Sequence, residues 1–128
     1  MTSMKVLLYS RWGYFLQIDG QQRIRGVRTR DDYCDLELKT VDFGKVTIRG
    51  EKTKAYVAVN AQGELCVAES TNPSCVWIEI QHLDGYNYYQ SDLHNKFYMG
   101  LKRIGVPKNG DKSGLGQVGC GFLSKPIT

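Results

Sequence analysis

The chain has 128 residues, of which 41% are hydrophobic and 23% are charged, and its net charge at pH 7 is +4. This length suits one domain with a single core, and the composition is ordinary for a globular protein. No run of 18 apolar residues occurs, and the apolar stretch near the start is only Val6-Leu7-Leu8, so the sequence predicts neither a membrane span nor a secretion signal.

Short runs that alternate apolar and polar residues follow one another along the chain. Turn-forming pairs such as Asp19-Gly20, Asp84-Gly85 and Asn109-Gly110 separate them. The clearest runs are residues 14–18, 36–38, 46–48 and 77–80. A period of two between such turns predicts antiparallel strands, and no segment has a convincing helical period. The sequence therefore predicts an all-β domain.

One unit of about 41 residues recurs three times along the chain. Its equivalent apolar positions are Leu16, Val57 and Met99; Ile24, Leu65 and Val106; Leu36, Trp77 and Phe122; and Ile48 and Tyr89. Four strands in each of three units predict a twelve-stranded β-trefoil that occupies residues 1–128 as one domain, with the barrel closed at one end by hairpins. Closure leaves few strand edges exposed, whereas three blades are too few for a propeller.

Three of the four cysteines obey the same symmetry. Cys34, Cys75 and Cys120 each stand two residues before a core position, which predicts small buried thiols on one inward face. Cys66 follows inward-facing Leu65 and is expected to face outward as a free, oxidisable thiol. Because the predicted orientations of Cys66 and Cys75 are opposite, we expect no intramolecular disulfide.

Catalytic and metal-binding patterns are weak. The two histidines, His82 and His94, have no zinc-binding spacing, and no Cys-x-x-Cys pair occurs. The glycines at 114, 116 and 119 lack the following helix that a phosphate loop requires, and Asp31-Asp32 fits a solvated turn. The sequence predicts no enzyme, no metal site and no cofactor.

Positive charge gathers in residues 94–118. This stretch has one acid, Asp111, and five basic residues, which are Lys96, Lys102, Arg103, Lys108 and Lys112. A local basic patch indicates a polyanionic partner such as nucleic acid, anionic lipid or a sulfated sugar, although a solvated lysine-rich surface has the same composition.

Several motifs resemble those of one family over nearly the whole chain, from Leu7 to Leu123. The Gln-x-Trp motif of ricin-type trefoil lectins is absent. The matching motifs are residues 14–18, 26–28, 56–60, 75–79, 86–89 and 100–105, continuing through Lys108, Gly110, Lys112, Gly116 and Gln117 to Phe122-Leu123. In their order and spacing these motifs resemble the heparin-binding, receptor-activating members of the fibroblast growth factor family.

The resemblance implies a heparan sulfate site in the basic loop. The corresponding residues are Arg11, Lys102, Arg103, Lys108, Lys112 and Gln117. Lys and Arg supply charge-assisted hydrogen bonds to sulfates, and a glycine-rich loop brings backbone N–H groups close to an anion. Val118 stands where the family usually has lysine, and Asp111 adds a negative charge, so we expect heparin affinity below that of the strongest members.

The resemblance also implies contacts with a receptor ectodomain. The corresponding residues are Tyr9, Arg28, Glu79, Tyr86, Asn87, Tyr89 and Leu123. Tyrosine and arginine are common interface anchors. The repeat pairs Tyr89 with Ile48, which alternatively predicts that Tyr89 packs on the barrel. Lys125 replaces a residue that is often apolar in the family.

The resemblance implies a secreted, extracellular growth factor and mitogen that is a monomer on its own. It would dimerise a fibroblast growth factor receptor tyrosine kinase with heparan sulfate as co-ligand, and so stimulate cell proliferation, migration or differentiation. Neither nucleic-acid binding nor membrane insertion is expected. An intracellular relative would suit the free thiols and missing signal, but Arg28, Glu79 and Asn87 argue against it. A general polyanion-binding module for nucleic acid would need exposed aromatic residues interleaved with the basic patch for base stacking, and we expect none there.

Overall fold

A computed structural model describes residues 2–127. The single-domain prediction also includes Met1 and Thr128, which lie outside the described residues. Within residues 2–127 the strands are β1 (Ser3–Ser10), β2 (Phe15–Ile18), β3 (Ile24–Val27), β4 (Leu36–Asp42), β5 (Lys45–Gly50), β6 (Tyr56–Val59), β7 (Leu65–Ala68), β8 (Trp77–Gln81), β9 (Asn87–Ser91) and β10 (Phe122–Pro126). Four short 3₁₀ helices join them: η1 (Asp32–Cys34), η2 (Pro73–Cys75), η3 (Gly110–Lys112) and η4 (Val118–Cys120).

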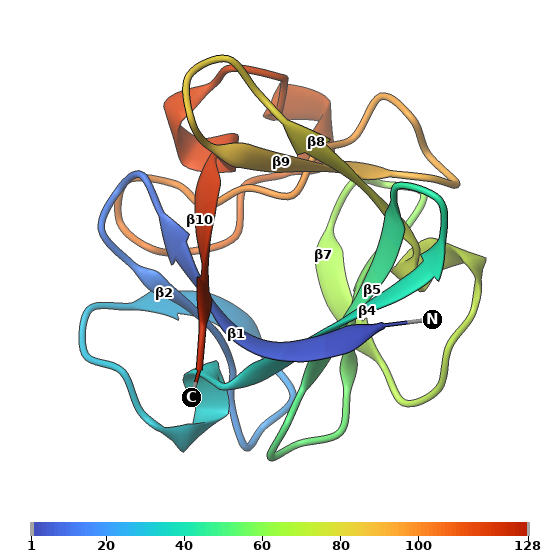
Figure 1. The fold of residues 1–128 in the computed structure, drawn as a ribbon. Helices are drawn as coiled ribbons and strands as arrows, with labels where there is room; N and C mark the ends of the chain where they lie inside the picture. Colours follow the sequence, from blue (N-terminus) through green and yellow to red (C-terminus); the bar gives the residue numbers. More distant parts are fainter. Residues whose placement is uncertain (1, 128) are drawn as a thin grey trace.

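Six strands close into a barrel. Going round the ring, each of β1, β4, β5, β8, β9 and β10 pairs antiparallel with the next, and β10 returns to β1. The β2–β3 hairpin extends from β1, and the β6–β7 hairpin extends from β5. Figure 1 shows this ring with the three units arranged around it. The predicted all-β trefoil is confirmed. Among the described residues, no helix is long and apolar enough to cross a membrane.

The core lies on the pseudo-threefold axis, as the repeat predicts. Leu36, Trp77 and Phe122 are each 0% exposed, and the Trp77 indole N–H donates to the Val57 carbonyl at 3.0 Å. The equivalent cysteines are equally buried, and each ends a 3₁₀ helix: Cys34 in η1, Cys75 in η2 and Cys120 in η4. Their predicted role as core thiols is confirmed.

The thiols differ in their access to solvent. Burial raises the pKa of Cys34 to about 11, which keeps it in the unreactive thiol form near neutral pH. Cys66 on β7 is half-buried rather than fully exposed, and partial burial raises its pKa too. All four cysteines are free in the structure, and the absence of a disulfide in solution stays a prediction.

The prediction of twelve strands is wrong by two, and both missing strands belong to the third unit. Its hairpin is reduced to two isolated bridges, Gln90 with Tyr98 and Leu101 with Pro107. Val27 and Ala68 continue the ladders of the first two hairpins. At the equivalent place in the third unit, the chain starts η3 at Gly110. The Tyr98 N–H therefore donates to the Ser113 hydroxyl at 2.7 Å rather than to a strand.

The third hairpin has the same six-residue pairing as the other two, but the residue in its apolar position is not the one that the repeat spacing predicts. Ile18 pairs with Ile24 and Val59 with Leu65, but Leu101 pairs with Pro107 rather than with Val106. Val106 is 41% exposed. Pro107 therefore takes the place that Ile24 and Leu65 have in the other hairpins, and it is partly buried.

Candidate functional site

Three hairpin turns occupy equivalent places around the trefoil axis and begin at Asp19, Asn60 and Lys102. In each, the N–H of the first residue donates to the carbonyl four residues later, at 2.9, 3.1 and 2.8 Å. The Asp19 side chain also accepts from the N–H groups two and four residues on, at 2.9 and 3.0 Å, and Asn60 does the same at 3.0 Å each. Lysine has no acceptor, so the side chain of Lys102 is left free to project from its turn.

A capping side chain is likewise lost at the start of the 3₁₀ helix that precedes a core position in each unit. Asp31 accepts from the Tyr33 N–H at 3.0 Å, and Asn72 accepts from the Ser74 N–H at 2.8 Å. The third unit has Gln117 at this position, and its side chain makes no capping bond to η4. At both positions the first two units use a side-chain oxygen to cap backbone N–H groups, and the side chain of the third unit makes no such bond.

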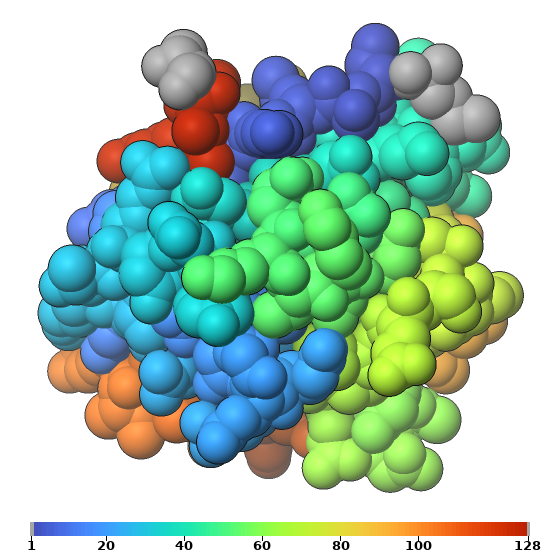
Figure 2. Space-filling model, turned by 90° about the horizontal axis from the view of Figure 1, so that it is seen from below, coloured from blue at the N-terminus to red at the C-terminus, as the bar shows by residue number. Residues whose placement is uncertain are grey.

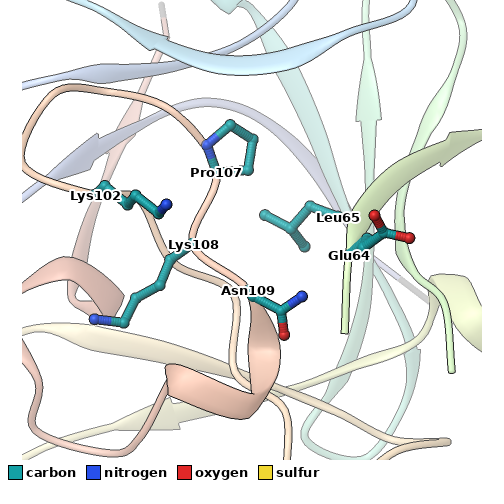
Figure 3. A pocket seen from close by; sticks show the side chains of 6 residues that line it. All are labelled: Glu64, Leu65, Lys102, Pro107, Lys108 and Asn109. Atoms are coloured by element: carbon teal, nitrogen blue, oxygen red, sulfur yellow. The ribbon is translucent and has the colours of Figure 1, made fainter. Parts of the chain in front are cut away.

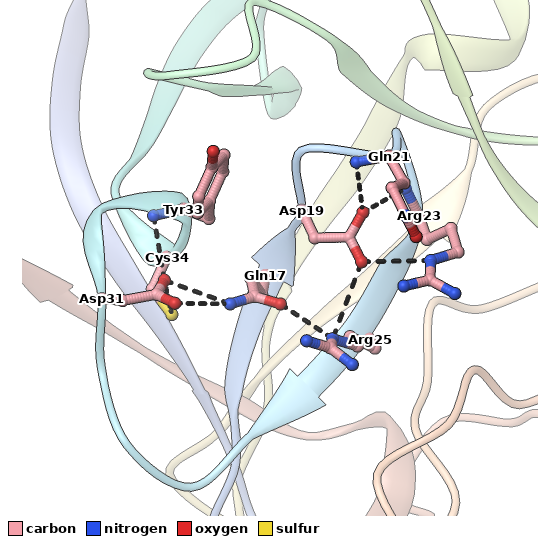
Figure 4. A network of polar contacts seen from close by, with 8 residues as sticks. All are labelled: Gln17, Asp19, Gln21, Arg23, Arg25, Asp31, Tyr33 and Cys34. Carbon is pink, nitrogen blue, oxygen red and sulfur yellow. Dashed lines mark hydrogen bonds and ion pairs between the residues drawn. The ribbon is translucent and has the colours of Figure 1, made fainter.

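The first unit neutralises its own cations (Figure 4). Gln17 donates its amide to both Asp31 oxygens, at 2.9 and 3.1 Å, and accepts from the Arg25 Nε at 2.9 Å. Asp19 pairs with the Nε atoms of Arg23 and Arg25, at 3.1 and 3.8 Å. Burial opposes the ionisation of Asp19, but hydrogen bonds from Arg23 and Gln21 outweigh it and lower its pKa.

The third unit has a basic residue at the position of Arg25 but lacks the acceptors that Gln17 and Asp19 provide in the first unit. Arg25 faces Gln17 across the first hairpin, and Lys108 faces Gly100 across the third, where the Lys108 N–H donates to the Gly100 carbonyl at 2.8 Å. Considering only residues 2–127, the four basic side chains of this loop form no ion pair; they are Lys102, Arg103, Lys108 and Lys112. The loop therefore presents uncompensated charge.

A pocket of about 280 Å³ lies beside this loop (Figure 3). It is lined by Glu64, Leu65, Lys102, Pro107, Lys108 and Asn109. Glu64 lies across the pocket from Lys102 and Lys108 with its carboxylate turned away from them. Gln117 lies over the glycine turn that follows η3, because its amide nitrogen would lie 3.1 Å from a Cβ placed on Gly114. The structure thus brings Lys102 and Lys108 together and leaves Gln117 folded over the glycine turn.

Arg11, the sixth residue predicted for heparin, has its charge already paired. Its guanidinium donates to Asp84 at 3.1 Å and to the Tyr88 hydroxyl at 3.4 Å, and it lies over the Tyr86 ring at 4.6 Å. Arg11 therefore contacts the β8–β9 turn, next to residues predicted to bind the receptor.

Five of the seven residues predicted for the receptor lie along four neighbouring strands, β1, β10, β9 and β8, whereas Tyr86 lies in the β8–β9 turn and Arg28 directly follows β3. Tyr9 on β1 pairs with Leu123 on β10, and Asn87 on β9 pairs with Phe122. The Tyr9 ring lies 4.9 Å from that of Phe15, and the Lys125 amine lies 4.5 Å over it. Lys125, which we expect to stand where the family often has an apolar residue, thus places its amine over part of this surface.

Tyr89 is the exception among the predicted receptor contacts. Its side chain is 0% exposed and packs with Phe122, with the two ring centroids 6.3 Å apart. Its hydroxyl donates to Glu79 at 2.9 Å. Burial raises the pKa of Tyr89, and the adjacent Glu79 raises it further. Tyr89 therefore offers no surface to a partner, and its packing on the barrel is the interpretation that the structure supports.

Sequence reasoning missed two aromatic residues at the junction of the surfaces. The Arg103 guanidinium lies 4.9 Å over the Trp12 ring, and the Tyr14 hydroxyl donates to the Arg103 carbonyl at 2.7 Å. These contacts join residues about 90 positions apart, so no local pattern signals them. Within the described range, no three His, Cys, Asp or Glu side chains gather in a way that could hold a metal ion.

Comparisons with known proteins agree with this geometry. The family model described as "Fibroblast growth factor" matches residues 4–123. Fibroblast growth factor 1 of Notophthalmus viridescens is 32% identical over 127 residues, covering 97% of this chain and 96% of the relative. Fibroblast growth factor 2 of Xenopus laevis is 33% identical over 120 residues, covering 93% and 77% respectively. Fibroblast growth factor 2 of Cavia porcellus is 35% identical over 112 residues, covering 87% and 66%. This chain, a β-trefoil with an unneutralised basic loop, belongs to the fibroblast growth factor family, which is a family of signalling growth factors and not of enzymes.

Proposed function

We propose that this growth factor is secreted, binds heparan sulfate through the loop of the third unit, and dimerises a fibroblast growth factor receptor tyrosine kinase with that sugar as co-ligand. The signal would stimulate cell proliferation, migration or differentiation. The free ligand is a monomer with no cofactor, and the dimeric assembly requires heparan sulfate and receptor.

One observation carries the proposal: at two positions where the other units use a side-chain oxygen to cap backbone N–H groups, the third unit has a side chain that caps none. Lys102 replaces Asp19 and Asn60, and Gln117 replaces Asp31 and Asn72. In the first unit, Asp19 pairs with Arg23 and Arg25 from within the chain. In the third unit the anions must come from outside, and sulfates supply them.

The spacing of the loop favours a chain of anions over a single ion. Lys102 and Lys108 line one pocket, Lys112 ends η3, and Gln117 precedes η4. Each contact of an exposed cation is weak, about 0.5–1 kcal/mol. Several such contacts along one sulfated chain act together, and a chain that also binds the receptor raises the effective concentration of both proteins.

The receptor contact rests on the surface along β1, β10, β9 and β8. Tyr9, Leu123 and Asn87 lie on adjacent strands, and Glu79 is held by the Tyr89 hydroxyl. Rigid aromatic anchors beside an oriented carboxylate are a common composition for an interface centre.

A pull-down with a receptor ectodomain, run with and without heparin, tests the proposal. Parallel pull-downs from a cytosolic extract and with a single-stranded DNA resin test the intracellular and nucleic-acid-binding alternatives. Capture that depends on heparin, and that is lost when Lys102 and Arg103 are both changed to Glu, is the expected result. Elution from a heparin column at or below physiological salt would overturn the sugar arm, because polyanion binding strong enough to matter persists through that screening.

A further inference from the structure

Tyr14 joins the basic loop to the predicted receptor surface. It is only 8% exposed and follows the β1–β2 turn, where its N–H donates to the Ser10 hydroxyl at 3.1 Å. A phenol hydroxyl donates one hydrogen bond and accepts others. That of Tyr14 donates to the Arg103 carbonyl at 2.7 Å and accepts from the Arg28 guanidinium at 3.2 Å.

The two arginines on either side of Tyr14 are each held by an aromatic ring. Arg28 lies 4.3 Å over the Tyr14 ring, and Arg103 lies 4.9 Å over the Trp12 ring. Arg28 also reaches the carbonyls of Trp12 and Gly13, at 3.4 Å each. Backbone contact tightens the junction, since the Gly26 N–H donates to the Gly105 carbonyl at 2.7 Å. In Figure 2 segments of all three units lie side by side on one face, with the orange segment near residue 100 beside the blue of the first unit.

We propose that the Tyr14 hydroxyl is a positioning group for both surfaces, because it holds the Arg103 backbone in the sugar-binding turn and the Arg28 guanidinium on the receptor side. This inference rests on the proposed function for its binding consequences. Arg103 belongs to the third unit and Arg28 to the first, so a single buried hydroxyl sets the relative placement of two side chains that serve different partners.

Geometry around Tyr14 leaves little room for another arrangement. A Cβ on Gly105 would lie 3.0 Å from the Tyr14 ring, and one on Gly26 would lie 2.7 Å from the Tyr14 Cβ. Both glycines therefore let the ring insert between the β3 strand and the third-unit turn. The ring is wedged by packing, and the hydroxyl then selects the positions of the two arginines by hydrogen bonding.

The test is Tyr14→Phe, which keeps the ring and its contact with Arg28 and removes only the hydroxyl. We expect about a three- to tenfold loss of affinity for an immobilised heparin octasaccharide and, separately, for the receptor ectodomain at saturating heparin, the range that corresponds to one lost hydrogen bond. Lys108→Gln should weaken heparin binding alone. Tyr33→Phe is the matched control, since the Tyr33 hydroxyl makes no hydrogen bond among the described side chains.

A ligand-free readout separates this inference from the proposed function. The Nε–H groups of Arg28 and Arg103, whose signals are followed by NMR in the isolated protein, should become more mobile in Tyr14→Phe. Their signals should stay unchanged in Tyr33→Phe. If the arginine signals move but the wild-type protein binds neither heparin nor receptor, the proposed function fails and the positioning role stands. If Tyr14→Phe leaves the arginine signals unchanged, or leaves both affinities within twofold in a wild-type protein that does bind, the positioning role is wrong. A fall in melting temperature alone would likewise overturn it, since that marks a structural role only.

Discussion

Replacing Lys102 with Asn should make the protein more stable and at the same time a weaker ligand for heparin. Asn60 stands at the equivalent position of the second unit and accepts two backbone hydrogen bonds, both at 3.0 Å. The third turn has the same form, with Gly63 and Gly105 both left-handed at φ 81° and 89°. An asparagine at 102 can therefore cap the N–H groups of Ile104 and Val106.

The magnitudes follow from these contacts. Capping by a short polar side chain is worth about 0.5–1.5 kcal/mol. For a chain of this length, 1 kcal/mol corresponds to a rise of roughly 3–5 °C in melting temperature. Loss of one exposed cation from a polyanion site costs about 0.5–1 kcal/mol, which is a two- to fivefold increase in Kd. The slope of log affinity against log salt should fall by roughly 0.7–0.9, the value per lost contact for nucleic-acid polyanions.

Thermal melting followed by circular dichroism and titration against a heparin octasaccharide at several salt concentrations measure both effects. Lys54→Asn is the matched control, because Lys54 is exposed, adopts φ 61° and lies outside the third unit. It should leave heparin affinity unchanged. A Lys102→Asn protein that binds heparin as tightly as the wild type would refute the idea that the third unit exchanged a structural acceptor for a ligand contact. A lower melting temperature would refute the equivalence of the turns.

Three further predictions concern the rest of the molecule. Gly119→Ala should destabilise the fold by roughly 2–4 kcal/mol in urea unfolding, because its Cβ would collide with the Leu101 carbonyl oxygen; a loss below about 0.5 kcal/mol would contradict this packing. Iodoacetamide at pH 8 should alkylate half-buried Cys66 well before Cys34, whose pKa is about 11; equal rates by mass spectrometry would show that the core opens. The hydrogen bonds that lower the pKa of Asp19 contribute stability that is present above the unfolded pKa near 3.9 and is lost as pH falls through the folded value, so Asp19→Asn should flatten the acid limb of the stability profile, and an unchanged limb would refute the assignment.

The repeat made much of the fold predictable. Burial on a period-two strand is a local property, so spacing alone located Leu36, Trp77 and Phe122 in the core with the three cysteines beside them. The third hairpin was less predictable. Its apolar spacing pointed to Val106, but the residue that pairs with Leu101 is Pro107, at the same six-residue separation as in the other two hairpins. The ladder then ends and the chain enters η3 at Gly110. Backbone pairing decides which residue is equivalent, and a match of apolar residues at a fixed spacing does not record that pairing.

The sequence by itself determined the all-β class, the threefold unit, the buried thiols and the basic stretch of the third unit, because each depends on residues that are near one another in the chain. Only the tertiary structure decided which charges are neutralised. Arg11 and Arg25 look as basic as Lys102, yet Asp84 pairs with the first across 73 positions and Asp19 pairs with the second. Only the structure shows that Tyr89 is buried, and that the Tyr14 hydroxyl contacts the Arg103 carbonyl 89 positions away in the chain. Ion pairs and burial depend on distances through space, and closure of the barrel sets those distances.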